Sequence, residues 1–525
     1  KLYFIKASES DQKNTQLQRY FSFIYDSVDY LETHRIGSGI EEIIIESEKF
    51  NSEPAVILLD ESVYKLSVDG SREKRVRVVY KINSNTAIKD FSRHVIIVNP
   101  ELETLEKILC VVTNGGSRVE TSETKTQSLS DPESRLYYDV IAHIISVPSL
   151  KLGSIVDIAY TIKTRRAEDY GSAFGLVTTI GGKNRVLYGN IIIDIPADKT
   201  VHFVTKNAHA LRPAVEIKDS RKTYLFSLRN IEPVHEEPFM PHLSEILPAV
   251  ASTSFSDWGG LYRWYFSLLR GRDIASEEML RDLRTIVHPN DVPLEKVRKI
   301  FNFVTSRIRY VGFEFGIGSI RPRAAAETYA SGMGDCKDIA LVLVALLRAA
   351  GIDARIALVR TSDYGENDMS IPWIGVFNHA ICYVNLEGGF FIDGTASFSG
   401  FRELPENDYG VKAFVIGDDG YRILDVRSAL FEPNIITIKN DVTIHDNGCA
   451  EIIRHFSKRG GMFAPYARYS MQNYESMMKN LAEYWNKTYP GSAITDLHII
   501  ESGTDKPVTY SYKIHVPTFA QTIDD

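Results

Sequence analysis

The most apolar run of the chain lies in its second half, at 339–347, and reads Ile-Ala-Leu-Val-Leu-Val-Ala-Leu-Leu. Because it is apolar on every face of a helix, the run predicts a helix buried on all sides. Arg348 and Gly351 follow it and are typical helix stop signals. The preceding residues, Gly334-Asp-Cys-Lys-Asp338, place Cys336 in the first turn of the predicted helix.

Four other segments repeat apolar residues three and four positions apart, which predicts amphipathic helices. One of them, Leu17 to Leu31, lies within a polar region at the beginning of the chain. The other three directly precede the buried helix. They span 258–269, 276–287 and 294–309. Residues 310–327 are rich in Gly, Pro and Arg, so we expect a surface loop there, close to Cys336.

Residues 55–230 have short alternating or β-branched runs separated by turn signals, a pattern typical of a β sandwich. The predicted strands are 56–59, 76–82, 94–98, 141–147, 155–162, 190–195 and 224–228. Strands also follow the buried helix, at 354–359, 380–386 and 390–392. Strands that follow a run of helices indicate an α+β domain.

A third pattern begins after Pro433, with short strands around the turn Asp446-Asn447-Gly448, a helical stretch near 472–485 and a strand at 508–516. The whole chain is thus predicted to be a multidomain α+β protein, which fits a length of 525 residues. The expected parts are a helical segment at 1–50, a β sandwich at 51–240, an α+β domain at 250–428 and a β-rich domain at 429–525 that need not be complete at Asp525.

The composition excludes several classes of protein. A hydrophobic share of 44% and a charged share of 24% are ordinary for a globular protein. The net charge of -8 gives no basic surface for nucleic acid. No apolar run approaches the length needed to cross a bilayer. The four cysteines lie far apart and form no CxxC pair, so neither a disulfide framework nor a zinc ribbon is expected.

Two short motifs suggest ligand sites but lack part of the required chemistry. Gly181-Gly-Lys-Asn184 has neither the first Gly nor the Ser or Thr of a phosphate-binding loop. The segment His235 to His242 contains two His and two Glu, but its prolines prevent a helix that presents both imidazoles on one face. A linker with solvated charges is the favoured interpretation. The sequence therefore predicts no metal and no organic cofactor.

Cys336 is either a small residue packed at a helix end or a nucleophile. The helix N-terminus favours the thiolate, and Lys337 next to it would add to this effect. A thiol that attacks a carbonyl also needs a base and a group that orients the base. The hairpin after the buried helix has both, since Asn378-His379-Ala380 opens one strand and Ile392-Asp393-Gly394-Thr395 closes the next.

The register of this hairpin decides whether His379 and Asp393 share a face. If Leu386 pairs with Phe390, both side chains point the same way, although a bulge or bend is needed to bring them together. If Gly388 and Gly389 form a two-residue turn, they point to opposite faces. The sequence is compatible with both registers. Cys382 has the other parity and is expected in the core.

Residues 310–395 resemble the core of the transglutaminase-like superfamily. The resemblance rests on Gly-Asp-Cys-Lys-Asp at 334–338, Leu-Leu-Arg-Ala-Ala-Gly-Ile at 346–352, Asn-His-Ala at 378–380 and Ile-Asp-Gly-Thr at 392–395. It implies a papain-like fold, in which a helix carrying the Cys packs on an antiparallel sheet carrying His and Asp. The wider layout is similar to bacterial proteins that place a β domain of unknown function before such a core.

Position by position, the resemblance makes Cys336 the nucleophile, His379 the general base and acid, and Asp393 the residue that orients His379. The oxyanion would be held by the backbone N–H of Cys336 and one upstream donor, for which Tyr310 is the candidate. Many members have Asp-Pro-Thr where this chain has Asp-Gly-Thr. Gly394 lacks the rigidity of Pro, so the orientation of Asp393 is left open by the sequence.

The resemblance implies a thiol-dependent enzyme acting on a protein, a peptide or another amide. An acyl-enzyme would be resolved by water in a cysteine protease or amidase, or by an amine in a cross-linking acyltransferase, and the bacterial resemblance favours hydrolysis. A periplasmic or extracellular location is expected, and a leader can have been removed ahead of Lys1. The alternative is a non-catalytic scaffold that binds protein or glycan through an inert domain. Such a domain has no chemical need for a thiol, an imidazole and a carboxylate together.

Overall fold

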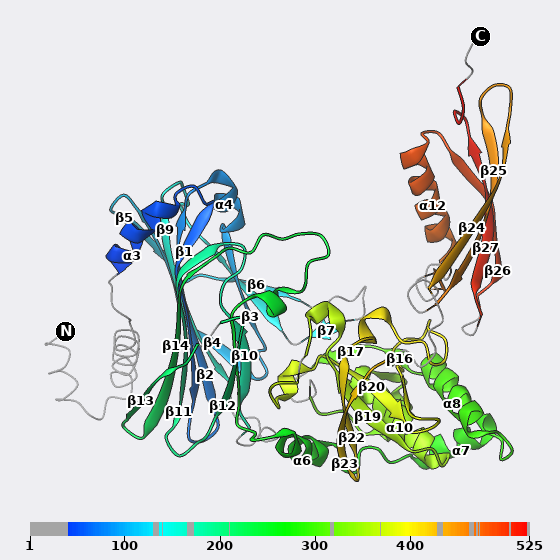
Figure 1. Cartoon of the computed structure of the whole chain (residues 1–525), viewed down its shortest axis with the longest axis horizontal. Helices are drawn as coiled ribbons and strands as arrows, with labels where there is room; N and C mark the ends of the chain where they lie inside the picture. Colours follow the sequence, from blue (N-terminus) through cyan, green and yellow to red (C-terminus); the bar gives the residue numbers. More distant parts are fainter. Residues whose placement is uncertain are drawn as a thin grey trace.

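The computed structural model describes residues 40–521 apart from short internal gaps. These gaps are 130–135, 139, 165–172, 209–210, 315–319, 368, 428–433, 461–466, 469–470, 472 and 503–505. The helix predicted from Leu17 to Leu31 lies outside the described residues. The fold is multidomain, with a β domain first, an α+β domain in the middle and a smaller β-rich domain at the end (Figure 1).

An eight-stranded sheet with the order β13-β14-β11-β1-β2-β9-β4-β5 forms the body of the β domain. Its neighbours are antiparallel except for β1 and β11, which run parallel. Six of the seven predicted strands of this region fall within observed strands, and the seventh, 141–147, extends one residue past β8. The strands of the sheet are β1 (Ala55–Leu66), β2 (Arg72–Ile82), β4 (Glu103–Asn114), β5 (Ser117–Thr121), β9 (Ile155–Thr164), β11 (Arg185–Pro196), β13 (Ala214–Lys218) and β14 (Arg221–Ile231).

Two three-stranded sheets cover the large sheet and confirm the predicted sandwich. One has the order β3-β8-β6 and encloses a core around Ile96, Ile145 and Ile158. The other has the order β10-β15-β12 and encloses a core around Ile193, Phe226 and Val250. Their strands are β3 (Arg93–Val98), β6 (Lys125–Ser128), β8 (Ile141–Ser146), β10 (Gly175–Thr179), β12 (His202–Lys206) and β15 (Ala249–Thr253). Short helices are α3 (Ile40–Ser47), η1 (Glu48–Phe50), α4 (Asn85–Asp90) and α5 (Leu243–Ile246).

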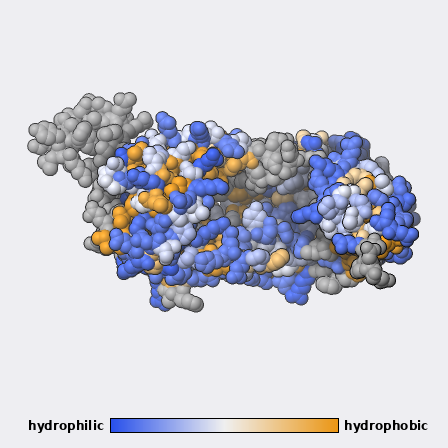
Figure 2. All heavy atoms as spheres, turned by 90° about the horizontal axis from the view of Figure 1, so that it is seen from above, coloured by the Kyte–Doolittle hydropathy of each residue, from blue (hydrophilic) through white to orange (hydrophobic). Residues whose placement is uncertain are grey.

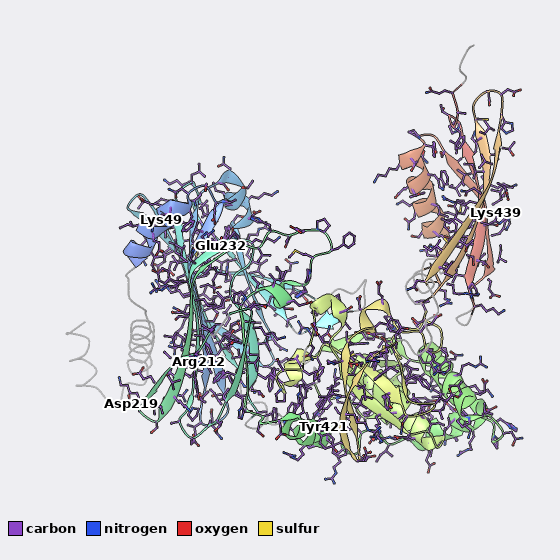
Figure 3. All side chains as sticks on the ribbon, viewed as in Figure 1. Lys49, Arg212, Asp219, Glu232, Tyr421 and Lys439 are labelled. Atoms are coloured by element: carbon purple, nitrogen blue, oxygen red, sulfur yellow. The ribbon has the colours of Figure 1, made fainter. Side chains whose placement is uncertain are left out.

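The middle domain is built on an antiparallel five-stranded sheet with the order β21-β20-β19-β22-β23. Its strands are β19 (Ala354–Val359), β20 (His379–Val384), β21 (Phe390–Ile392), β22 (Lys412–Gly417) and β23 (Gly420–Asp425). The helices are α6 (Trp258–Leu269), α7 (Glu277–Ile286), α8 (Pro293–Arg307), α9 (Ala325–Ser331) and α10 (Cys336–Ala349), with short turns η4 (Ser362–Tyr364), η5 (Ile374–Val376) and η6 (Glu406–Asp408). Tyr421 of β23, labelled in Figure 3, packs on Tyr262 of α6 with ring centroids 5.9 Å apart.

Helix α10 is buried as its sequence predicts. Each of the nine residues from Ile339 to Leu347 is at most 2% exposed. One side of the helix faces a core formed with α7, α8 and α9, and another faces a core that contains α6 and the middle of the sheet. Burial of this much apolar surface holds the helix rigidly in the centre of the domain.

Residues 310–327 differ from the predicted surface loop. They include β17 (Gly312–Glu314) and the beginning of α9, and β16 (Arg309–Tyr310) pairs with β18 (Met333–Gly334). Strand β17 pairs in parallel with β7 (Leu136–Tyr138) of the β domain, and the two labels lie together in Figure 1. Both pairings join residues far apart in the sequence, so local composition gave no sign of them.

The β domain and the middle domain also share a core. Ala173 and Ala251 of the β domain belong to the same buried cluster as Tyr265, Ala340 and Trp373. Gly175 at the beginning of β10 lies directly on the Trp373 ring, and a Cβ atom there would overlap it. The two domains therefore form one packed unit.

The C-terminal domain is a four-stranded antiparallel sheet with the order β24-β25-β27-β26, covered by α12. Its elements are β24 (Ile435–Ile444), β25 (Ala450–Arg459), α12 (Tyr474–Thr488), β26 (Ala493–Glu501) and β27 (Val508–Val516). Seen from above, apolar side chains gather on the surface of the β domain, whereas this face of the C-terminal domain is mostly hydrophilic (Figure 2). Within the described part of the chain, no helix is long and apolar enough to cross a membrane.

Candidate active site

Cys336 is the first residue of α10, as the sequence predicts. Asp335 caps this helix, since its carboxylate accepts a hydrogen bond of 3.2 Å from the backbone N–H of Asp338. The first N–H groups of a helix have no acceptor within the helix and carry its positive end. The half-buried Cys336 side chain therefore lies beside backbone donors at the end of a rigid element.

The charged residues around Cys336 hold the turn ahead of α10. Lys337 forms a buried ion pair with Asp335, and burial raises the pKa of Asp335 to about 6 although Lys337 opposes this. Asp338 is bound by Arg323, whose backbone N–H donates at 2.8 Å and whose Nε donates at 2.9 Å. Lys337, which the sequence suggested would favour the thiolate, is thus largely neutralised by Asp335.

The hairpin formed by β20 and β21 has a register that places His379 and Asp393 on one face. Val384 pairs with Phe390 and Cys382 pairs with Ile392. This register is shifted from the predicted pairing of Leu386 with Phe390, but the shift preserves the parity. The fully buried Cys382 points to the opposite side, into the core that contains α10.

His379 and Asp393 are in direct contact. The distance between His379 Nε2 and Asp393 Oδ2 is 3.2 Å, and the two side chains are 16% and 1% exposed. The backbone N–H and the Oγ–H of Thr395 each donate to Asp393 Oδ1 at 2.8 Å. The carboxylate is therefore held by its own turn as well as by the imidazole.

Cys336 lies near the His379 imidazole, and its thiol is among the groups that favour the charged ring. His379 Nε2 contacts Asp393, so Nδ1 is the ring nitrogen available to the Cys336 sulfur. Burial alone would lower the pKa of His379, but Asp393 and then Cys336 outweigh burial and raise this pKa well above its ordinary value. Burial likewise opposes ionisation of Asp393, yet His379 and Thr395 keep its pKa below the usual value. The arrangement favours an imidazolium beside a carboxylate.

Gly394 explains how Asp393 is oriented without the proline found in many relatives. A Cβ atom at Gly394 would lie 2.6 Å from Ile339 Cγ2 and 2.8 Å from Leu343 Cδ1. The turn that carries Asp393 is thus in close contact with the helix that carries Cys336, and any side chain would force them apart. Because Gly394 has no side chain, this turn and helix α10 can pack directly against each other.

Tyr310, the predicted oxyanion donor, lies next to the turn that precedes Cys336. It pairs with Gly334 in the short parallel sheet, and the following N–H, of Val311, donates to Gly334 O at 2.9 Å. Its side chain is half-buried against the core around α10. Its part in binding an oxyanion stays a prediction.

One residue at the site was missed by the sequence analysis. Asp408, the last residue of η6, is 1% exposed, and its carboxyl lies with the ligand atoms of His379 and Asp393 within 4.8 Å of one another. In the part of the chain that the structure describes, this trio is the group whose spacing would suit a metal ion. The segment Pro405-Glu-Asn-Asp-Tyr-Gly410 is typical of an exposed turn, and only Leu404 before it and Tyr409 within it indicate burial.

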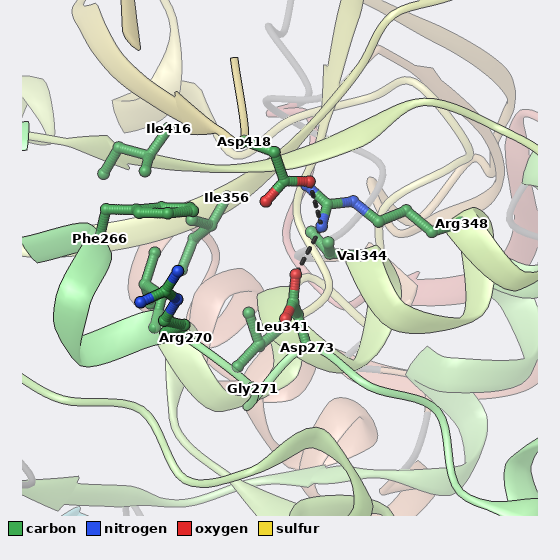
Figure 4. A pocket seen from close by; sticks show the side chains of 11 residues that line it. Phe266, Arg270, Gly271, Asp273, Leu341, Val344, Arg348, Ile356, Ile416 and Asp418 are labelled. Atoms are coloured by element: carbon green, nitrogen blue, oxygen red, sulfur yellow. Dashed lines mark hydrogen bonds and ion pairs between the residues drawn. The ribbon is translucent and has the colours of Figure 1, made fainter. Parts of the chain in front are cut away.

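A separate cavity of about 320 Å³ lies on another side of α10. Its walls are apolar side chains from α6, α10, β19 and β22, and charged residues stand at its rim (Figure 4). There Arg348 pairs with Asp273 and, at 3.4 Å, with Asp418. Cys336, His379 and Asp393 do not line this cavity.

Comparison with known proteins agrees with the fold. Residues 283–391 match the transglutaminase-like superfamily, and residues 68–235 match a domain of unknown function named DUF3857. The chain thus carries a transglutaminase-like domain behind a DUF3857 domain. No curated protein matches it.

One similar solved structure supports the same architecture. A "putative protease" from Parabacteroides distasonis is 13% identical, with a TM-score of 0.60, and the match covers 88% of this chain and 93% of that chain. A "putative cysteine protease" from Cytophaga hutchinsonii is 12% identical, with a TM-score of 0.16 and coverage of 62% and 76%. At such identities the first likeness establishes the fold alone, and the second adds no argument.

Proposed function

We propose that the chain is a cysteine peptidase or amidase that acts through Cys336, His379 and Asp393. The observation that carries the proposal is the 3.2 Å contact between His379 Nε2 and Asp393 Oδ2, with Cys336 near the same imidazole at the N-terminus of the buried helix α10. A peptidase-like function also agrees with the family of the middle domain and with the protease named among its structural neighbours.

In the proposed reaction, the Cys336 proton moves to His379 Nδ1 and the thiolate attacks the carbonyl carbon of an amide. The negative charge on the carbonyl oxygen is stabilised by the backbone N–H of Cys336 and by a second donor near Tyr310. The imidazolium then protonates the departing amine, which leaves an acyl group bonded to the sulfur. Asp393 keeps the ring oriented and stabilises its positive charge throughout.

The second half of the reaction decides between hydrolysis and transamidation. His379 removes a proton from an incoming water or amine, the acyl group passes to it, and the proton returns to the thiol. We propose water as the acceptor, which makes the products a carboxylic acid and free enzyme. The proposal includes a location outside the bacterial cytoplasm, which fractionation of the producing cell would test.

The experiment that tests this function is a screen of a peptide and amine library against the protein and its Cys336→Ala variant. We expect peptide or amide cleavage with wild-type protein, loss of turnover in the variant, and no incorporation of the amines. Amine incorporation would reassign the protein as a transamidase. No turnover of any member, together with Cys336 alkylation that is unaffected by His379→Ala, would favour the inert scaffold.

A further inference from the structure

A second buried carboxyl group lies beside the Cys336–His379–Asp393 chain. Asp408 is 1% exposed and lies against both Asp393 and His379. Among the described residues, its Oδ2 atom is buried without a hydrogen-bond partner. Two carboxylates in such close contact repel each other strongly in a buried site, so a pair of this kind shares a proton.

The contacts indicate which of the two carboxyls holds the proton. Asp393 accepts hydrogen bonds from His379 and from two donors of Thr395, and all three favour its charged form. Asp408 faces Asp393 instead of such donors. Burial, followed by the charge of Asp393, raises the pKa of Asp408 to about 7. The proton therefore belongs to Asp408.

We propose that Asp408 is a positioning residue of this site. As a neutral carboxylic acid it donates its O–H to Asp393 and holds that carboxylate in the orientation that His379 requires. It acts through Asp393 and not on the substrate. The inference rests on the proposed function, because the orientation of Asp393 has a chemical consequence only if His379 works with Cys336.

The proposal gives the site a dependence on pH. Three elements bring charged groups to Asp408, namely His379 of β20, Asp393 at the end of β21 and Asp363 of η4. The neighbouring Tyr409 accepts a hydrogen bond from Leu404 N at 2.8 Å. His379 favours ionisation of Asp408, whereas burial and the two carboxylates oppose it. When Asp408 ionises, its donated hydrogen bond is lost and a second negative charge repels Asp393.

A bound cation is a less suitable explanation of the trio. His379 Nε2 and Asp393 Oδ2 contact each other, and Thr395 Oγ donates to both oxygens of Asp393. These ligand atoms are thus directed at hydrogen-bond partners and not at a common central point. A shared proton satisfies the same atoms without a metal ion.

The test measures alkylation of Cys336 by iodoacetamide in the full chain, with mass spectrometry of the modified peptides. Cys449, also half-buried, is the reference thiol in the same sample. Asp408→Asn keeps a donor of the same shape that cannot ionise, and Asp408→Leu removes the donor. Asp60→Asn is the matched control, because Asp60 is a carboxyl in the β domain whose pKa burial raises to about 6. Circular dichroism checks that each variant is folded.

At about pH 6 we expect Asp408→Leu to slow Cys336 alkylation about tenfold, because this variant loses the hydrogen bond to the charged Asp393. Asp408→Asn keeps a donor at this position, so it should slow alkylation less than about twofold. Between about pH 6 and about pH 8 the ratio of the wild-type rate to the Asp408→Asn rate should fall, because only wild type ionises. The Asp60→Asn protein should follow wild type throughout.

Parallel pH profiles of wild type and Asp408→Asn would overturn the proposal, as would an unchanged rate in folded Asp408→Leu. A rate that changes on dialysis against EDTA would assign the trio to a metal ion instead. The proposed function is tested separately by His379→Ala. If that variant slows alkylation and Asp408→Leu does not, the positioning role fails while the function stands. If neither variant slows it, both fail.

Discussion

At the scale of single residues, the site depends on how two carboxyls with opposite tendencies are placed. Three donors keep Asp393 ionised, whereas burial keeps the proton on Asp408. The sequence suggested Cys336, His379 and Asp393 as candidates because their residue types and order match a known chemistry. It missed Asp408, since the burial of a polar turn depends on packing of η6 against η4 and β20, which no local pattern encodes.

Thr395 provides a test of how Asp393 is held. Thr395→Val removes the Oγ–H donor and keeps both the shape of the side chain and the backbone N–H donor. We expect Cys336 alkylation to slow several-fold, since a hydrogen bond to a charged group contributes about 1.5–3 kcal/mol. Ser at this position should restore the wild-type rate. An unchanged rate in Thr395→Val would show that the backbone N–H and His379 suffice.

At the scale of elements, the long periodic segments were predicted well. The helix expected at 258–269 matches α6, and the strand expected at 354–359 matches β19, because strong apolar periodicity and burial coincide there. Strands β22 and β23 were not predicted, since β23 is largely exposed and its sequence lacks alternation. The sequence left two hairpin registers of opposite parity open. The observed register has a longer loop, at 385–389, in which Gly388 and Gly389 both adopt positive φ.

The close contact of Gly394 with α10 gives a second prediction. Gly394→Ala places a methyl group against Ile339 and Leu343, so the turn must move away from the helix. Overpacking of this kind costs about 1–3 kcal/mol of unfolding free energy, which chemical denaturation would measure. Alkylation of Cys336 should slow in the same variant because Asp393 moves with the turn. Ile339→Ala in the Gly394→Ala background makes room for the methyl group and should recover part of the alkylation rate.

The cap of α10 gives a third prediction. Asp335→Ala removes the capping carboxylate and leaves Lys337 buried without its partner. Loss of one partner from a buried ion pair costs about 3–5 kcal/mol, so we expect a large drop in unfolding free energy. Asp335→Asn, which retains the cap, should lose less. Equal losses in the two variants would mean that the cap contributes little and that loss of the ion pair accounts for most of the effect.

At the scale of the whole molecule, the β domain is part of the structure that supports the active site. It contributes residues to the core beneath the sheet, and its strand β7 pairs with β17 in the segment that leads to Cys336.

Gly175→Val would insert a side chain into the Trp373 ring. We expect this variant to lower the melting temperature and to expose residues 254–257, which connect β15 to α6, to proteolysis. Gly260→Val is the control, because φ is not positive there either and a Cβ would meet no atom closer than 3.4 Å.

Three buried carboxyls should each contribute less to stability as pH rises from about 4 to about 7. Burial raises the pKa of Asp408 to about 7 and those of Asp60 and Asp335 to about 6, so over this range these groups bind more protons in the folded chain than in the unfolded chain. The unfolding free energy then decreases with pH, by up to about 1.4 kcal/mol per pH unit for each such group. The raised pKa of His379 acts in the same direction at higher pH. In Asp408→Asn the decrease should be smaller, as urea denaturation across this pH range would reveal.

The parallel pairing of β1 with β11 has a consequence for the order of folding. Residues 55–66 and 185–196 pair side by side although most of the β domain lies between them in the chain. Contacts of such long sequence separation form slowly, because the intervening loop must be closed first. During synthesis the large sheet cannot be completed until β11 and β14 have emerged. The Cys336 helix, which is made later and shares a core with the β domain, would therefore reach its place only after this sheet is complete.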